Sequence, residues 1–277
     1  MSAYENYDRS SRHYDHTRVP VGGEIILGCL AGQRKPLHEL VVLDAGCGTG
    51  AYTRAIVDRV GRVAAIDMSR GMVEVARAKL RDQAAAARVG FHQGSIAALP
   101  FAAESFDAVM INQVLHHLDD SAAEDFPAHR RVIGECARVL RRGGALLINS
   151  CSHQQLRDGY WYRQLVPRAA ESMCRRFVPL EVLRRAMADA GLVHRGDFVP
   201  MDAVCQGAAY FDGRGPLSQE WRDGDSIWTL ADDDELARAQ ARVRELDRAG
   251  TLEAFVAEHD ARRPRVGQIT FSFATRA

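Results

Sequence analysis

The sequence predicts an α/β fold: a doubly wound, mostly parallel sheet with helices on both faces and an inserted helical lid. Two observations lead to this fold class. From about residue 40, short apolar runs rich in β-branched residues alternate with amphipathic stretches, which is the order typical of βαβ units. At 201–267 turns and helical patterns interrupt this alternation, before a last apolar run begins at Ile269.

Each predicted strand is a short apolar run that ends near a polar residue or a glycine. These runs are Val41–Asp44, Val63–Ile66, Val89–His92, Phe106–Ile111, Ala145–Asn149, Leu192–Val199 and Ile269–Ala274. Each predicted helix has a recognisable start or end, such as the N-cap Ser69 or the terminal Gly61. The helices are Tyr52–Val60, the stretch from Ser69 to Leu80, Val132–Leu140 closed by Gly143–Gly144, and Leu180–Ala190. Right-handed connections between such units place helices on both faces of the sheet.

We expect the chain to have three parts. These are an N-terminal lid segment at 1–30, a core at 31–200 and 268–277, and a substrate-binding insertion at 201–267. The insertion combines a turn-rich half, Gly207–Trp228, with two helical patterns. A connection of this length inside a compact domain usually has a function of its own, so we interpret it as a lid.

The composition excludes several classes of protein. The chain has 36 basic and 36 acidic residues, so its formal net charge is zero and no basic surface for nucleic acid is indicated. Its apolar runs are too short to span a bilayer, and residues 1–18 lack the apolar centre of a secretory signal. We therefore expect a cytoplasmic monomer or homodimer that acts on a small-molecule substrate and binds neither nucleic acid nor membrane.

The six cysteines show neither C-x-x-C spacing nor zinc-ligand spacing, so we expect reduced thiols and no metal site. The alternative is a thiol relay for a thiophilic substrate such as arsenite. It would use the cysteines in regions expected to face substrate, Cys151, Cys174 and Cys205.

A glycine-rich turn follows the first predicted strand. Gly46, Gly48 and Gly50 allow positive φ and let a ligand approach the backbone closely. Asp44 stands at the strand end before them, where a carboxylate would repel a pyrophosphate but suits a ligand with an ammonium group. Thr53 stands where a dinucleotide site has glycine or alanine, so the turn predicts a different nucleotide ligand.

The second predicted strand leads directly into Asp67 and Met68. An acid at this strand end can accept two hydrogen bonds from a ribose diol. The apolar side chain of Met68 either covers an adenine face or simply packs. Both residues therefore extend the predicted nucleotide site.

The combination of motifs resembles the class I S-adenosylmethionine-dependent methyltransferases, in their ubiquinone/menaquinone-biosynthesis-like branch. The matching stretches are Leu43–Gly50, Ala65–Ser69, Leu99–Phe101 with Ser105–Val109, Val114–Leu118 and Arg138–Gly144. The resemblance implies a Rossmann-like fold and S-adenosyl-L-methionine as cofactor.

The same resemblance implies roles for single residues. Asp44 would contact the methionine amino group of the cofactor, and Asp67 would hold the ribose hydroxyls. Ser95 stands where the family often has an acid for the adenine amino group, so Ser95 or the neighbouring Ile96 must supply that contact.

The fourth predicted strand is followed by Asn112, which we expect to face the cofactor and the methyl-transfer region. His116 and His117 come one turn later. Either histidine could act as a general base, and Asn112, His116 and His117 are the candidate catalytic residues. The alternative is that both histidines pack structurally against the sheet.

Candidate substrate-binding residues lie outside these motifs. The N-terminal segment could cover the site, with an arginine as clamp for a carboxylate, or could be a solvated tail. Two aromatic clusters either form a recognition surface for a zwitterion, sulfonium or ammonium group, or fill the core of the lid itself. The candidates are Tyr7, Tyr14 and Arg18, then Tyr160, Trp161 and Arg163, then Trp221, Arg222, Asp225 and Trp228.

The expected reaction is in-line transfer of a methyl group to a small molecule. The leading hypothesis is S-methylation of a thioether such as methionine, because the insertion is similar to that of bacterial methionine S-methyltransferases and no base is required. The alternatives are C- or O-methylation of a quinone-like ring or other secondary metabolite, and a non-catalytic regulatory protein that binds S-adenosylmethionine.

Overall fold

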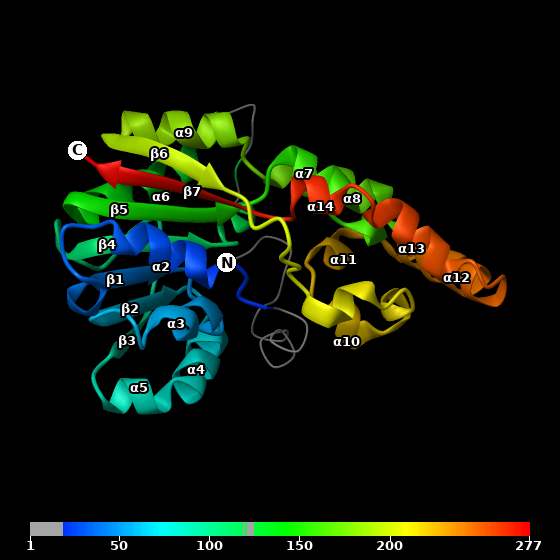
Figure 1. The fold of residues 1–277 in the computed structure, drawn as a ribbon, viewed down its shortest axis with the longest axis horizontal. Coiled ribbons are helices and arrows are strands. Elements are labelled where there is room, and N and C mark those ends of the chain that lie inside the picture. Colours follow the sequence, from blue (N-terminus) through cyan, green and yellow to red (C-terminus); the bar gives the residue numbers. More distant parts are fainter. Residues whose placement is uncertain (1–18, 119, 121–124) are drawn as a thin grey trace.

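The computed structural model describes residues 19–118, 120 and 125–277, in which seven strands form one sheet of order β3-β2-β1-β4-β5-β7-β6 (Figure 1). All neighbouring strands pair in parallel except β7, which is antiparallel to both β5 and β6. The prediction of a mostly parallel, doubly wound sheet is confirmed. The strands are β1 Val41–Ala45, β2 Arg62–Asp67, β3 Val89–Gln93, β4 Phe106–Asn112, β5 Leu140–Ser150, β6 Leu192–Phe198 and β7 Thr270–Arg276.

Helices connect and cover the strands. Several begin at the N-caps that local chemistry favours: Ser69 accepts a hydrogen bond from Met72 N at the start of α4, and Ser152 forms a capping box with Gln155. No helix of the described residues is both long and apolar enough to cross a membrane. The helices are α2 Gly23–Ala31, α3 Ala51–Ile56, α4 Arg70–Lys79, α5 Arg81–Ala85, α6 Pro127–Val139, α7 His153–Asp158, α8 Pro167–Arg176, α9 Leu180–Asp189, α10 Gln219–Arg222, α11 Ile227–Leu230, α12 Asp233–Arg248, α13 Leu252–Asp260 and α14 Arg263–Val266, with 3-10 turns η2 Leu37–Glu39, η3 Leu115–His117, η5 Trp161–Leu165, η6 Gly207–Phe211 and η7 Gly215–Leu217.

The alternation of side chains along the strands builds two apolar layers. Val42 of β1 belongs to the layer shared with α2 and α3, whereas Leu43 belongs to the layer shared with α6 and α9. Within α2, Ile26 and Leu30 are fully buried. Residues 23–31, mostly within the segment expected as N-terminal lid, are thus packed on the core.

The glycine pair Gly143–Gly144 lies inside β5 instead of closing the preceding helix. A Cβ at Gly144 would lie 2.8 Å from the carbonyl oxygen of Arg141 and 2.9 Å from that of Asp107. The β4–β5 register shifts between Phe106 and Ala108 at the same place. The glycines therefore serve a bulge that needs close backbone approach, and β5 begins directly after α6.

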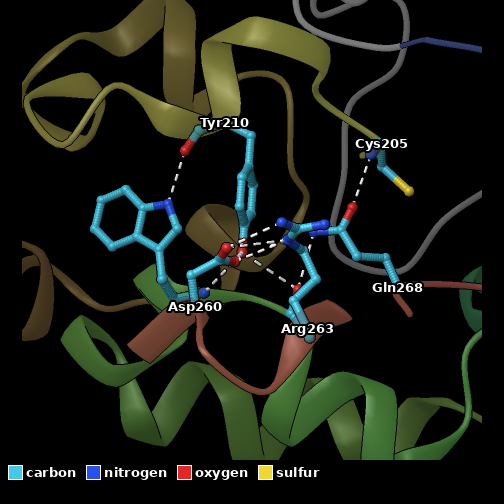
Figure 2. A network of polar contacts seen from close by, with 7 residues as sticks. Cys205, Tyr210, Asp260, Arg263 and Gln268 are labelled. Atoms are coloured by element: carbon cyan, nitrogen blue, oxygen red, sulfur yellow. Dashed lines mark hydrogen bonds and ion pairs between the residues drawn. The ribbon is translucent and has the colours of Figure 1, made fainter. Parts of the chain in front are cut away.

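The insertion lies between β6 and β7, beyond the carboxyl ends of the parallel strands (Figure 1). Figure 2 shows contacts within the insertion: the Tyr210 hydroxyl donates to Asp260 Oδ1 (2.6 Å), and Arg263 pairs with the same carboxylate (2.9 Å). In addition, Trp161 Nε1 donates to the Tyr210 carbonyl (2.7 Å), and Gln268 Nε2 donates to the carbonyl of Gly159 (2.9 Å). The Trp161 bond joins the insertion to the segment that follows β5, and the Gln268 bond joins the residue after the insertion to the same segment. The insertion and this segment share one apolar core.

Candidate cofactor and acceptor site

The register of the sheet brings the predicted polar residues to one edge. Asp44 of β1 pairs with Ala65 of β2 on one side and with Met110 of β4 on the other. Asp67 and Asn112 each follow two residues after those partners, at the carboxyl ends of their strands. The three side chains therefore belong to neighbouring strand ends, where open parallel sheets bind ligands.

Asp44 is a buried carboxylate with one oxygen in use. It is 1% exposed, and its Oδ2 accepts a hydrogen bond from Thr53 Oγ1 at 2.5 Å. Among the described residues, Oδ1 has no hydrogen-bond partner. Burial raises the pKa of Asp44 to about 7 and the charge of Asp67 adds to this rise, whereas the Thr53 hydrogen bond and the neighbouring Asn112 amide oppose it. The site thus holds an acceptor oxygen whose ionised form needs a cationic partner.

The three glycines of the turn differ in purpose, although all have left-handed φ values of +82°, +52° and +78°. A Cβ at Gly46 would clash with Val114 Cγ2 at 2.5 Å, and one at Gly50 would press on Ala76 and Leu80 at 3.1 Å. A Cβ at Gly48 would meet nothing within 4 Å. Gly46 and Gly50 therefore permit close packing, whereas Gly48 leaves the backbone open on the side available to a ligand.

Asp67 braces this turn from the next strand. Its Oδ2 accepts from Gly48 N and its Oδ1 from Ser69 N, both at 2.9 Å. Burial raises the pKa of Asp67, and these backbone donors oppose the rise. The Met68 backbone also lowers this pKa through a hydrogen bond, and a carboxylate can accept a further donor such as a hydroxyl.

The remaining predicted cofactor residues have different environments. Met68 is 42% exposed, which leaves its side chain available to a flat ligand. Ser95 Oγ accepts a hydrogen bond from Ala97 N (3.2 Å), and Ile96 is buried against the core. Asn112 is buried, and its Nδ2 has no partner within the described part of the chain.

Asn149 and Tyr52, whose roles sequence reasoning missed, form a polar network beside Asn112. Gln113 Nε2 donates to Asn149 Oδ1, and Asn149 Nδ2 donates to the Tyr52 hydroxyl, both at 2.8 Å. That hydroxyl in turn donates to the carbonyl of Val21 at 3.1 Å. The network joins the ends of β4 and β5 to α3, and its only sequence signal was a polar residue after each apolar run.

The two histidines lie in η3, after β4. His116 is buried, its ring stacks on Phe177 at 4.4 Å, and its centroid is 3.9 Å from that of His117. This packing is what the structural alternative expects, and a role as general base stays a prediction.

Several of the predicted substrate residues use their side-chain donors in hydrogen bonds to backbone carbonyls of the insertion. Trp161 Nε1 and Trp221 Nε1 donate to the carbonyls of Tyr210 and Ala209, both at 2.7 Å. Arg222 donates to the carbonyl of Pro216 at 2.7 Å. These contacts favour the alternative in which the aromatic residues form the core of the lid itself.

The other candidates gather around Tyr162. Its hydroxyl donates to Asp225, and its ring stacks on Trp228 at 5.9 Å. The guanidinium of Arg163 lies 4.0 Å from the ring centroid of Tyr160, which is itself 5.8 Å from that of Tyr162. The candidates Tyr7, Tyr14 and Arg18 lie outside the described residues.

Comparisons with known proteins agree with this geometry. Residues 43–148 match the model of a family described as a methyltransferase domain. Demethylmenaquinone methyltransferase of Lactococcus lactis subsp. lactis is 37% identical over 123 residues, 43% of this chain and 45% of that protein. Ubiquinone biosynthesis O-methyltransferase of Methylocella silvestris is 30% identical over 195 residues, 68% of this chain and 67% of that protein. The chain thus spans less than half the length of the Lactococcus relative and two thirds of the Methylocella one.

The fold has a solved counterpart. A crystal structure described as a methyltransferase from an antibiotic biosynthesis pathway of Anabaena variabilis matches 95% of this chain and 100% of its own. The TM-score is 0.70 at 21% sequence identity, so the likeness is one of fold.

Proposed function

The chain belongs to the class I S-adenosylmethionine-dependent methyltransferases, in their quinone-biosynthesis-like branch, and from this premise we propose that it transfers a methyl group to a small-molecule acceptor. The observation that supports this most directly is the unpartnered Oδ1 of Asp44, at the end of the strand that leads into the glycine turn. A buried carboxylate oxygen without a donor is costly unless a ligand supplies one.

The residues at this edge fit the cofactor. Asp44 Oδ1 would accept from the ammonium of its methionine part, and Asn112 Nδ2, also unpartnered, is a donor suited to its carboxylate. Asp67 would accept from the ribose hydroxyls, and Met68 would lie against the adenine. When bound, S-adenosylmethionine supplies a methyl group activated on a sulfonium. The protein orients the groups and keeps water out.

Asp67→Ala should weaken binding of S-adenosylhomocysteine by at least tenfold. The change removes one or two charge-assisted hydrogen bonds to the ligand, each about 1.5–3 kcal/mol, and also the brace on Gly48 N. Calorimetry measures the affinity, and Asp58→Ala, an exposed acid after α3, is the control. A dissociation constant within twofold of the parent would show that Asp67 does not touch the ligand.

Two acceptor chemistries remain as candidates. S-methylation of a thioether such as methionine fits an aromatic, charge-bearing insertion. Methylation of a quinone-like ring is favoured by the names of the Lactococcus and Methylocella relatives, whose alignments reach beyond the family motifs. The third hypothesis is a non-catalytic protein, which would bind the cofactor but form no S-adenosylhomocysteine with any acceptor. Analysis of the reaction products tests it.

The pH dependence of turnover should separate the two chemistries. A thioether loses no proton, so at saturating cofactor and acceptor the rate should be nearly flat from about pH 6 to 9. A phenol or carbon acid needs a base, and a histidine base would give a limb near about pH 6.5. His116→Ala and His117→Ala should then cost about 10²–10⁴-fold in the second case and little in the first. The exposed His38, changed to alanine, is the matched control.

A further inference from the structure

Unsatisfied polar atoms also belong to residues outside the strand ends that carry Asp44, Asp67 and Asn112, which we call the cofactor edge. Nine buried side-chain nitrogen or oxygen atoms among the described residues have no hydrogen-bond partner. Two of them belong to Asp44 and Asn112. Four more belong to residues on η5 and the insertion: Arg163 Nε, Gln206 Nε2, Gln206 Oε1 and Trp228 Nε1.

We call the residues that carry these four atoms, together with the two tyrosines that link Arg163 to Trp228, the acceptor cluster: Tyr160, Tyr162, Arg163, Gln206 and Trp228. Arg163 lies over the Tyr160 ring at 4.0 Å, and Tyr162 links Tyr160 to Trp228 by ring contacts of 5.8 and 5.9 Å. The Tyr160 hydroxyl lies 3.9 Å from Cys205 Sγ, and Gln206 is the next residue.

The cluster connects to the strand ends where methyl transfer is proposed. The Tyr160 hydroxyl lies 4.0 Å from Cys151 Sγ, one residue beyond β5. Cys151 Sγ lies 3.8 Å from Gln113 Nε2, and Gln113 follows Asn112 at the end of β4. Side-chain contacts through Gln113 and Cys151 therefore link the end of β4 to the acceptor cluster.

Arg163 carries the positive charge of this cluster. It is 5% exposed, and the one hydrogen bond from its side chain to another described residue runs from Nη1 to the carbonyl of Leu156 at 2.8 Å. No carboxylate forms an ion pair with it in the part of the chain that the structure describes. Asp225 contributes charge nearby, but its oxygens accept from the Tyr162 hydroxyl and from Ile227 N. A buried guanidinium with free donors is suited to an incoming carboxylate.

Gln206 adds a neutral group with both polarities. Its side chain is 3% exposed, and neither its Oε1 nor its Nε2 has a partner among the described residues. An amide buried in this way destabilises the fold unless something else pairs with it. Its oxygen suits an ammonium or hydroxyl donor, and its nitrogen suits an acceptor.

Resting on the proposed function, we infer that the methyl acceptor is a small carboxylic acid whose carboxylate binds Arg163 and whose neighbouring polar group binds Gln206. An amino acid satisfies both, since its ammonium stands one carbon from its carboxylate. The inference names the acceptor by its anionic end and leaves open which atom receives the methyl group.

The side-chain Nε–H resonance of Arg163 tests this without requiring turnover. In ¹⁵N-labelled protein saturated with S-adenosylhomocysteine, the resonance is assigned by its loss in Arg163→Lys. L-methionine, benzoate and propionate are titrated against their carboxamides. We expect at least one acid to shift the Arg163 resonance saturably and its carboxamide to bind at least tenfold more weakly. Arg263, buried and paired with Asp260, is the internal control and should not move.

The inference is overturned if no acid shifts Arg163, or if acid and carboxamide shift it equally. Its failure is distinguishable from failure of the proposed function. Methylation of a neutral acceptor with a silent Arg163 resonance rejects the carboxylate and keeps the methyltransferase. If instead the Arg163 resonance responds to a carboxylate but no acceptor yields S-adenosylhomocysteine, the carboxylate site is kept and the methyltransferase activity is rejected.

Gln206→Leu gives an independent test. Leucine keeps the volume and removes the two unpaired polar atoms, so the ligand-free melting temperature should rise by about 2 °C or more. Affinity for the acid identified above should nevertheless fall at least tenfold, measured by the same titration. A rise in melting temperature with unchanged affinity would show that Gln206 is only a packing residue.

Discussion

Asp44→Asn should weaken S-adenosylhomocysteine binding by about 10²–10³-fold, because breaking a buried charge pair costs about 3–5 kcal/mol and part of that is recovered by the amide. The ligand-free protein should still fold, and above neutral pH it should be more stable than the parent. Asp44 is buried with one oxygen unpartnered, so its negative charge is a burden until a cation arrives. Calorimetry at pH 8 and thermal melting at the same pH measure the two effects.

The pH dependence gives this prediction a sign. Burial raises the pKa of Asp44 to about 7, so the native protein holds a proton that the unfolded chain releases at lower pH. The contribution of Asp44 to the stability of the ligand-free protein should therefore fall as pH rises from about 4 to 7, and the difference between the parent and Asp44→Asn measures it. Cofactor affinity should instead rise with pH through about 7, because the ammonium needs the ionised carboxylate. Asp44→Asn should abolish both dependences.

Thr53 supplies a control for the same group. Its hydroxyl donates to Asp44 Oδ2 at 2.5 Å and lowers the pKa of that carboxyl. Thr53→Val should move the midpoint of the affinity profile to higher pH, and Thr53→Ser should leave it in place. An affinity that is flat between pH 6 and 8 in the parent protein would contradict the assigned role of Asp44.

Gly48→Val should reduce cofactor affinity by more than about 100-fold. The valine side chain would occupy the space next to the turn, so the ligand could no longer approach the backbone as closely as glycine permits. At this position φ is +52° and no atom lies within 4 Å of a Cβ, so a new side chain would enter open space and compete with the ligand for it. The variant also incurs the left-handed backbone penalty of about 1–2 kcal/mol. Affinity and stability must therefore be measured separately.

Gly250 offers a matched control for the strain. It follows α12, has φ +70°, and a Cβ there also meets nothing within 4 Å. Gly48→Ala and Gly250→Ala should lower the stability of the protein by similar amounts, whereas only Gly48→Ala should weaken the binding of S-adenosylhomocysteine. Equal affinities in the two alanine variants would show that Gly48 has a purely conformational role.

The cofactor edge could be predicted from sequence because its information is local. Asp44, the glycines and Asp67 all stand at strand ends that apolar runs define, and parallel pairing brings such ends together. Thr53 was noted only as a missing glycine, since its bond to Asp44 depends on how α3 turns. The glycines at 143 and 144 were misinterpreted because a helix end and a bulge need the same residue type.

The acceptor side could be predicted only in part, because aromatic and charged residues suit a core and a binding surface equally well. Sequence placed Trp161 and Arg163 in one candidate set, yet the Trp161 indole is occupied by Tyr210 and the Arg163 guanidinium has free donors. Gln206 gave no signal at all. What separates these residues is which polar atoms remain unpaired, and that depends on contacts across the insertion.

The antiparallel strand β7 has a consequence for the order in which the protein folds. It lies between β5 and β6 and pairs Ser150 with Thr270, across the whole length of the insertion. Until β7 docks, β5 and β6 each present a bare edge, and closing so long a loop is slow. A nascent chain released before this strand emerges therefore exposes two strand edges with unpaired backbone groups. The chain is most prone to aggregate in the period before β7 docks.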